Sequence, residues 1–411
     1  MPFYYLFLLL APFQEHPKLG VVLLDAGVVP ITPTKLVGIL MVAAAFLTSR
    51  PVAAAPRLPT AIPTLYALFV LLPLAEVIVF GLPMPTRSLS ALISYGLLLA
   101  ATRRLVCTAE RLQNVLRVLV LAETIGSLWL YKQQYIEHIP NPHGPSSDSN
   151  YEALSIVMML PLAVYLMRHD AMVFWRTSAL VCLPALAFGV FVSQSRGGVV
   201  ALGTLCLLGW LHSRRKFALA AGGLIILAAL AIAAPSVTWS RFQQIQVTGR
   251  PTTGAEMSTR TRIELWRGGL RMIETHPVFG IGLDQFKSQV GYYNAALYKV
   301  SNRNYIAHNT YIHIAAEEGI PILCLFLCML WLAQKNYRVV RKSGSSSGFA
   351  EISVAMRLGL IAYMIAAFFL SAQLEKTLWV FLPLSQNLRE IVADKGRVGG
   401  NETGVHATEA A

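Results

Sequence analysis

The sequence predicts an all-α, polytopic integral membrane protein. Hydrophobic residues make up 55% of the 411 residues and charged residues only 13%, about half the charged share of an average soluble domain. The mean hydropathy is +0.55. Apolar stretches of near-spanning length also recur along the chain, with short polar connections between most of them.

Roughly twelve transmembrane helices are expected from these stretches. A broken apolar stretch at 3–31 and a second at 35–48 come first. The others cover 61–82, 88–102, 112–131, 152–167, 174–193, 197–211, 217–234, 309–334, 352–373 and, more briefly, 378–388. Met1 to Phe13 carry no basic leader or small-residue cleavage site, so we interpret them as part of the mature protein.

Basic residues fall in every second connection. They are Arg50, Arg57, Arg103, Arg104, Arg111, Arg168, Arg176, Arg214, Arg215, Lys216, Lys335, Arg338, Arg341 and Lys342. By the positive-inside rule, these connections are cytoplasmic. The extracytoplasmic ones are then 83–87, 132–151, 194–196, 235–308 and 374–377. We therefore expect a helix bundle at 1–234, a large periplasmic loop at 235–308, C-terminal transmembrane helices at 309–391 and a cytoplasmic polar tail at 392–411.

Several function classes are disfavoured by the composition and by missing motifs. The net charge of +13 is divided among short loops rather than gathered on one module, so nucleic-acid binding is not expected. The five cysteines lie in or beside apolar runs and show no zinc spacing. A Walker loop, a His-Glu-x-x-His pattern and a nucleophile elbow are all missing. We therefore expect no metal or cofactor, and any chemistry would depend on arginine and histidine.

The 235–308 loop is basic, although the positive-inside rule predicts few basic residues in an extracytoplasmic loop. It holds nine Lys or Arg against four Asp or Glu. Either the loop rests on anionic lipid head groups, or it handles an anionic substrate. A helix is predicted at 260–275, with an apolar face of Ile263, Trp266, Leu270 and Ile273 and with Arg262 on its flank. His276-Pro277 ends this helix, and Gly280-Ile281-Gly282 predicts a tight turn.

At residues 307–321 the polar loop gives way to an apolar segment that is predicted to be helical. Asn309 or Thr310 can cap the helix, which leaves His308 exposed just outside it. The sequence Gly319-Ile320-Pro321 predicts a kink. Glu317 and Glu318 lie too far along the helix to bond His308 directly.

Other polar groups sit at the ends of apolar segments. Arg196 lies at a tight outer hairpin beside Gly197 and Gly198, as a functional group or as an interfacial anchor. Ser149 and Glu152 have capping-box spacing, which explains this segment, although Asp148 or Asn150 could instead bind a glycan. Three carboxyl residues are functional candidates or partners of a nearby arginine. These are Glu76, Glu123 and Glu375.

Three motifs resemble those of the O-antigen ligase/polymerase superfamily of bacterial envelope glycosyltransferases. The first motif is Ser195-Arg196-Gly197-Gly198. The second is Arg262-Ile263-Glu264-Leu265-Trp266, followed by His276-Pro277-Val278-Phe279-Gly280-Ile281-Gly282. The third is His308-Asn309-Thr310-Tyr311, which runs on to Glu318-Gly319-Ile320. The likeness covers most of the chain in organisation and its second half in motifs.

The resemblance implies a multi-pass glycosyltransferase of lipopolysaccharide biosynthesis in the bacterial inner membrane. It would move O-antigen from undecaprenyl diphosphate to a sugar hydroxyl of lipid A–core on the periplasmic face, with inversion and without a metal. Arg196 and Arg262 match the family's arginines and suit the leaving diphosphate. His308 matches its histidine and would accept or orient the attacking hydroxyl. Further substrate contacts are expected from Arg260, Arg267, Asn309, Tyr311, Asp148 and Asn150.

Other functions stay open at this point. A polymerase of the same superfamily would join the glycan to another lipid-linked glycan, but one dominant outer loop favours a ligase. A flippase or other transporter of lipid-linked oligosaccharides would need ionisable residues on both sides of the bilayer midplane. Here the candidates cluster on the outer face, and the expected partners are the donor, the acceptor and membrane lipids.

Overall fold

The computed structural model describes residues 1–13, 24–25, 30–47, 61–139, 142–145, 148–212, 254–298, 305–343 and 347–408. Within these ranges the protein is all-helical except for one short antiparallel pair, β1 (Leu24–Asp25) and β2 (Pro30–Ile31), in which Leu24 opposes Ile31. The all-α prediction is confirmed. The span expected at 217–234 and the loop segment 235–253 lie outside the described residues.

The helices follow one another in this order. They are α1 (Pro2–Leu10) with the 3₁₀ turn η1 (Ala11–Phe13), α2 (Pro33–Leu47), α3 (Ala61–Phe80), α4 (Thr86–Leu105), α5 (Ala109–Tyr131) with the π turn η2 (Lys132–Ile136), α6 (Ser149–His169), α7 (Val173–Val192), α8 (Arg196–His212), α11 (Gly254–Thr275), α12 (Phe286–Tyr293), α13 (Ala295–Tyr298), α14 (Thr310–Lys342), α15 (Ser347–Ala366) and α16 (Lys376–Thr408).

Six of the described helices are long and apolar enough to cross a membrane. They cover Ala61–Phe80, Ala109–Ile136, Ser149–His169, Val173–Val192, Thr310–Lys342 and Gly348–Ala366. Three shorter apolar helices cover Pro2–Phe13, Pro33–Leu47 and Arg196–Leu211. The protein is therefore a multi-pass membrane protein, while the described residues do not reach the expected twelve spans.

One predicted span ends earlier than expected. Helix α15 stops at Ala366, and residues 367–375 form turns rather than the last part of a 352–373 span. These turns bond to the start of α14, where the Thr310 amide donates to the Ala367 carbonyl at 2.9 Å. The helix ends because its next polar groups find partners on α14.

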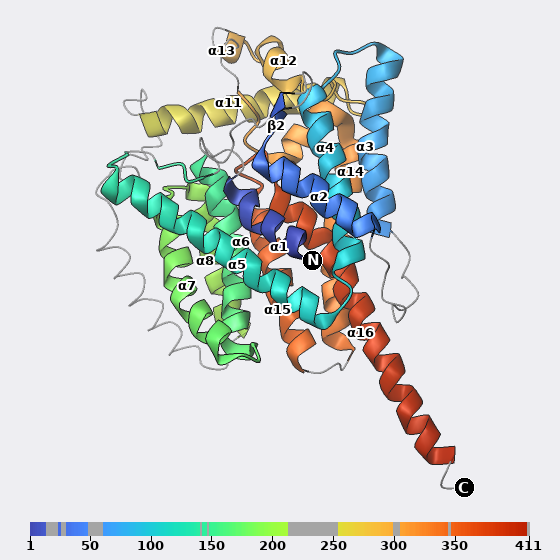
Figure 1. The fold of residues 1–411 in the computed structure, drawn as a ribbon. Helices are drawn as coiled ribbons and strands as arrows, with labels where there is room; N and C mark the ends of the chain where they lie inside the picture. The colour runs from blue at the N-terminus through green and yellow to red at the C-terminus, as the bar shows by residue number, and fades with distance from the viewer. Residues whose placement is uncertain are drawn as a thin grey trace.

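Helices α11, α12 and α13 lie together at one end of the molecule, where α11 runs crosswise to the long helices such as α3 and α14 (Figure 1). The last turns of α16 project beyond the opposite end (Figure 1). In the middle, Trp379 of α16 is fully buried and contacts Tyr66 and Tyr95 with ring centroids 4.8 and 6.1 Å apart. Such aromatic pairs add about 0.5–1.5 kcal/mol each beyond area burial.

Two of the connections predicted to be extracytoplasmic are joined directly, because Ser195 donates to Asn150 at 2.9 Å. Beside these connections, Ser88 donates to Asp284 at 2.6 Å and Tyr151 to the Ser371 carbonyl at 2.8 Å. Two ion pairs of 2.6 Å, Arg103–Glu390 and Arg117–Asp170, each include one residue of a connection predicted to be cytoplasmic. The assignment of sides to the membrane stays a prediction.

The apolar face predicted for the 260–275 helix is not the face that packs against the rest of the protein. Ile263 and Leu270 are 43% and 49% exposed, and α11 instead buries Leu265, Gly268, Gly269 and Met272. A Cβ atom at Gly269 would lie 2.5 Å from the Ile312 side chain, and one at Gly268 would lie 2.9 Å from Val290. The two glycines let α11 pack closely against α12 and α14, so the helix docks by its small residues.

Candidate active site

The start of α14 is fixed from two sides. Asn309 caps the helix, because its Oδ1 accepts hydrogen bonds from the Tyr311 and Ile312 amides at 3.0 Å. The Thr310 hydroxyl donates to the Leu370 carbonyl at 2.6 Å and accepts from the Ala372 amide at 2.8 Å. The predicted cap is confirmed, and the segment before it is held in one place.

His308 occupies the position just before this cap. Its backbone is left-handed, with φ of 48°, a conformation in which histidine is enriched several-fold among non-glycine residues. Its Nδ1 atom is buried and has no hydrogen-bond partner within the described residues. Burial and the positive charge of Arg262 lower the pKa of His308 from 6.5 to about 4, against the opposing effect of Asp148. The imidazole is therefore neutral near pH 7, and its unprotonated nitrogen can accept a hydrogen bond from a hydroxyl group.

Two arginines from distant parts of the chain belong to the same cluster, in which Arg262 acts electrostatically on His308 and Arg196 acts on Arg262. Arg262 lies on the flank of α11 and is half-buried, as expected. Burial lowers its pKa from 12.5, the charge of Arg196 lowers it further, and Asp148 opposes both effects. Arginine stays protonated in proteins, so two positive charges lie within electrostatic range of each other, with the Asp148 carboxylate acting on Arg262 and His308. The structure thus places Arg262 within electrostatic range of both other predicted catalytic residues.

Arg196 is the first residue of α8, and the motif around it sets how closely this helix can pack. The Ser195 hydroxyl accepts from the Gly198 amide at 3.2 Å and donates to Asn150. A Cβ atom at Gly197 would lie 3.0 Å from the Cβ of Phe369, and one at Gly198 would lie 2.7 Å from the Cβ of Ala153. The paired glycines therefore allow close packing of α8 against α6 and the 367–375 turns.

The N-terminus of α6 joins the same cluster through its cap. Asp148, rather than Ser149, is the N-cap, and its carboxylate accepts from the Asn150 amide at 2.8 Å and from Asn150 Nδ2 at 3.0 Å. The predicted capping box is wrong because the aspartate one residue earlier takes that position. The starts of α6, α8 and α14 are thereby close together, and the amides of helix N-termini favour an anion.

The second and third motifs interlock behind His308. Gly319 breaks α14 with φ of 85° and ψ of 169°, which confirms the predicted kink. Across this break, the Ile320 amide donates to the Pro277 carbonyl and the Gly282 amide to the Glu317 carbonyl, both at 2.8 Å. The Glu317 carboxylate accepts from the Asp284 and Phe286 amides at 3.0 and 2.8 Å. These contacts attach the end of the 235–308 loop to the helix that carries the histidine.

Four residues that were predicted to contact the substrate either bond to other parts of the protein or lie on an exposed face. Arg260 and Arg267 lie on the exposed face of α11, where Arg267 pairs with Glu264. Asn309 serves as the α14 cap. The Tyr311 hydroxyl donates to the Met364 carbonyl at 2.7 Å.

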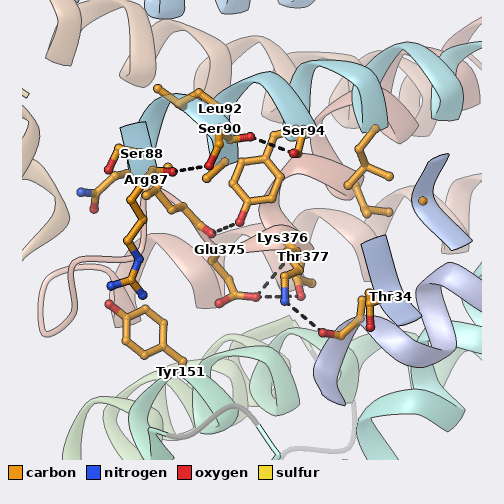
Figure 2. Close-up of a pocket in the computed structure, with 18 of the residues that line it drawn as sticks. Thr34, Arg87, Ser88, Ser90, Leu92, Ser94, Tyr151, Glu375, Lys376 and Thr377 are labelled. Atoms are coloured by element: carbon orange, nitrogen blue, oxygen red, sulfur yellow. Dashed lines mark hydrogen bonds between the residues drawn. The ribbon is translucent and has the colours of Figure 1, made fainter. Parts of the chain in front are cut away.

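A cavity of about 1020 Å³ adjoins the Arg196–Arg262–His308 cluster without being lined by these three residues. Asp148 and His313 line it, and both interact electrostatically with His308. Figure 2 shows Arg87, Ser88 and Ser94 of α4 on one side, with Glu375 and Lys376 nearby. The candidate site thus has two neighbouring parts, a cationic cluster and a roomier cavity lined by both polar and apolar residues.

The cavity holds residues that the sequence predictions did not select as site residues. His313 shares a 2.8 Å hydrogen bond with Ser371, and Gln373 lies two residues further on. Both Ser371 and Gln373 were assigned to a membrane span. Their signal was a run of polar residues, Ser371, Gln373 and Glu375, at alternating positions directly after an apolar helix.

The fold and this site define a multi-pass membrane protein with arginine and histidine gathered at one end of its helix bundle. Residues 180–327 match the family model for O-antigen ligase, a segment that contains all three motifs and the whole cluster. The match confirms the resemblance to the O-antigen ligase superfamily, whose members are ligase- and polymerase-type membrane enzymes. No curated protein matches the chain.

Proposed function

We propose that this protein transfers O-antigen from undecaprenyl diphosphate to a sugar hydroxyl of lipid A–core on the periplasmic face of the inner membrane. The observation that carries the proposal is the convergence of Arg196, Arg262 and a neutral His308 with a free Nδ1. Two guanidinium groups suit the phosphate oxygens of a diphosphate. The unpartnered nitrogen suits a hydroxyl proton.

The step is a single displacement at the anomeric carbon of the donor. The acceptor oxygen forms a bond to this carbon while the bond from the carbon to the diphosphate oxygen breaks, and the electron pair leaves with the diphosphate. The proton of the acceptor hydroxyl passes to Nδ1 of His308. Arg196 and Arg262 stabilise the charge that develops on the leaving group. Attack from the opposite face inverts the anomeric centre.

Both arginines act as fixed positive charges where another enzyme uses a metal ion. Asp148 offsets part of the mutual repulsion of the two guanidinium groups, and burial of Arg262 strengthens these interactions by excluding water. Negative charge on the leaving diphosphate grows as the glycosidic bond breaks. The two arginines therefore bind the transition state more tightly than the bound donor, as transition-state stabilisation requires.

The direct test is transfer in a reconstituted bilayer with EDTA present. Proteoliposomes receive undecaprenyl-diphosphate glycan and, in separate reactions, lipid A–core or a second lipid-linked glycan as acceptor. The ligase proposal expects product with lipid A–core only. Product with the lipid-linked glycan alone would identify a polymerase, and movement of the donor across the bilayer without any new glycosidic bond would identify a flippase.

A further inference from the structure

Three buried hydrogen-bond acceptors point to a ligand in the cavity. Glu123 Oε2 of α5, Gln373 Oε1 and Glu318 Oε2 of α14 have no hydrogen-bond partner within the described residues. Their side chains are at least nine-tenths buried, with exposed fractions of 5%, 9% and 3%. All three residues line the 1020 Å³ cavity. Buried polar atoms are rarely left without a partner, and each of these oxygens can accept a hydrogen bond.

The charge of the cavity excludes the lipid diphosphate as this ligand. Seven carboxyl residues line it, against four lysines and arginines. A diphosphate offers only acceptor oxygens and negative charge, so it cannot donate to Gln373 Oε1 and meets more carboxyl groups than cations in the lining. Hydroxyl groups donate hydrogen bonds, and a sugar ring carries several of them in a rigid array.

The remaining wall of the cavity is apolar and comes from other helices. Phe7 of α1, Met41 of α2 and Leu97 of α4 contribute to it. Figure 2 shows the polar side, where Ser88, Ser90 and Ser94 lie along α4 and Tyr151 enters from α6. A cavity with one hydroxyl-binding side and one apolar side fits a glycolipid.

We propose that this cavity binds the acceptor glycolipid, with its sugar hydroxyls bonded to Glu123, Gln373 and Glu318 and its acyl part along the α1–α2–α4 wall. This inference rests on the proposed transfer reaction and assigns the acceptor its place. The cavity meets the cationic cluster at Asp148 and His313. An acceptor in the cavity would therefore approach the anomeric carbon of the donor from a side that the diphosphate does not occupy.

The chain offers a matched pair of glutamines for the test. Gln373 and Gln386 are both buried, and each has an Oε1 without a partner within the described residues, but only Gln373 lines the cavity. Substitution by methionine removes the acceptor and keeps the length of the side chain. Glu123→Met removes a second acceptor from another helix and serves if Gln373→Met does not fold.

The experiment measures donor-free binding in lipid nanodiscs without sugar detergents, because a maltoside head group would compete for the cavity. Radiolabelled core oligosaccharide, freed of its acyl chains, is equilibrated with the full-length protein. Gln373→Met is expected to raise the Kd about three- to tenfold, the effect of one neutral hydrogen bond. Gln386→Met should bind the oligosaccharide with the Kd of the wild type. Intact lipid A–core should displace the oligosaccharide at lower concentration than unlabelled oligosaccharide does.

Each other outcome has a defined meaning. Equal binding by Gln373→Met, Glu123→Met and wild type would overturn the inference and leave the cavity to water. If the Gln373→Met and Glu123→Met variants bind undecaprenyl-diphosphate glycan more weakly but bind the oligosaccharide as the wild type does, the inference is also overturned and the cavity is assigned to the donor. If the binding pattern holds but the wild type transfers nothing, the proposed function fails while the glycan site stands. If transfer occurs with all variants alike, the function stands without the site.

Discussion

At the scale of single residues, the state of His308 decides what chemistry the site can perform. The imidazole is neutral because burial and Arg262 disfavour its protonated form. Its Nδ1, which has no partner among the residues that the structure describes, can accept a hydrogen bond, and the attacking hydroxyl of an acceptor sugar can donate one. A motif alone suggests this histidine, but only the fold shows which groups surround it.

Replacement of His308 by alanine tests its role in proton transfer. General-base catalysis typically contributes 10²–10⁴-fold, so His308→Ala should slow transfer by about that factor. His276→Ala is the matched control, because His276 lies within the same family match but is exposed at the end of α11. The rates are measured in proteoliposomes. A normal rate in His308→Ala would exclude the role.

The pH dependence of kcat/KM provides a second test. The base form of His308 is the neutral one, and its pKa is lowered to about 4. The base form therefore persists as the pH falls, and the acid limb should lie near pH 4 rather than near 6.5. Transfer rates between pH 4 and 8 at low donor concentration would show this limb. Half-loss at pH 6.5 would mean an unperturbed histidine.

At the scale of elements, glycines determine how the loop and the helices fit. The sequence predicted the kink at Gly319, the turn at Gly280–Gly282 and the cap of α14. It did not predict which face of α11 packs against α12 and α14, since the apolar face seen in the sequence, which includes Leu270, is a different one. Gly268 and Gly269 carry no hydropathy signal, yet close approach of two helices depends on them.

Gly319→Ala tests the junction between α14 and the 277–285 loop. A Cβ atom there would lie 2.0 Å from the Val278 carbonyl oxygen, on a backbone with φ of 85°. Strain of this kind costs of order 1–3 kcal/mol, so the thermal midpoint of unfolding should fall. Gly203→Ala is the control, because it lies in α8 with no neighbour within 4 Å. An unchanged midpoint in Gly319→Ala would contradict the interlocked junction.

At the scale of the whole molecule, charge alternation predicted more than hydropathy did. It grouped 83–87, 132–151, 194–196 and 374–377 with the large loop, and the fold brings residues of these segments together. The cavity itself could not be predicted, because it is assembled from residues as distant in sequence as Glu123 and Gln373. Hydropathy also extended one span through Ser371 and Gln373, since the bond of Ser371 to His313 of α14 and the bond of the Gln373 carbonyl to Trp379 of α16 are tertiary.

The orientation of the bundle can be measured by labelling. In a cysteine-free background, Glu274→Cys on exposed α11 should react with a membrane-impermeant maleimide in intact spheroplasts. Ser343→Cys, exposed at the end of α14, should react only after the membrane is opened. The opposite pattern would place the cationic cluster in the cytoplasm and contradict a periplasmic reaction.

We expect His308 and Arg262 to act as a unit on one reaction. The decisive measurement is the single-turnover rate of transfer by His308→Ala, Arg262→Gln and the double variant. Residues that act together show strongly non-additive losses of rate, so the double variant should be about as slow as the slower single variant. If the two rate reductions instead multiply in full, the two side chains work independently and do not form one catalytic unit.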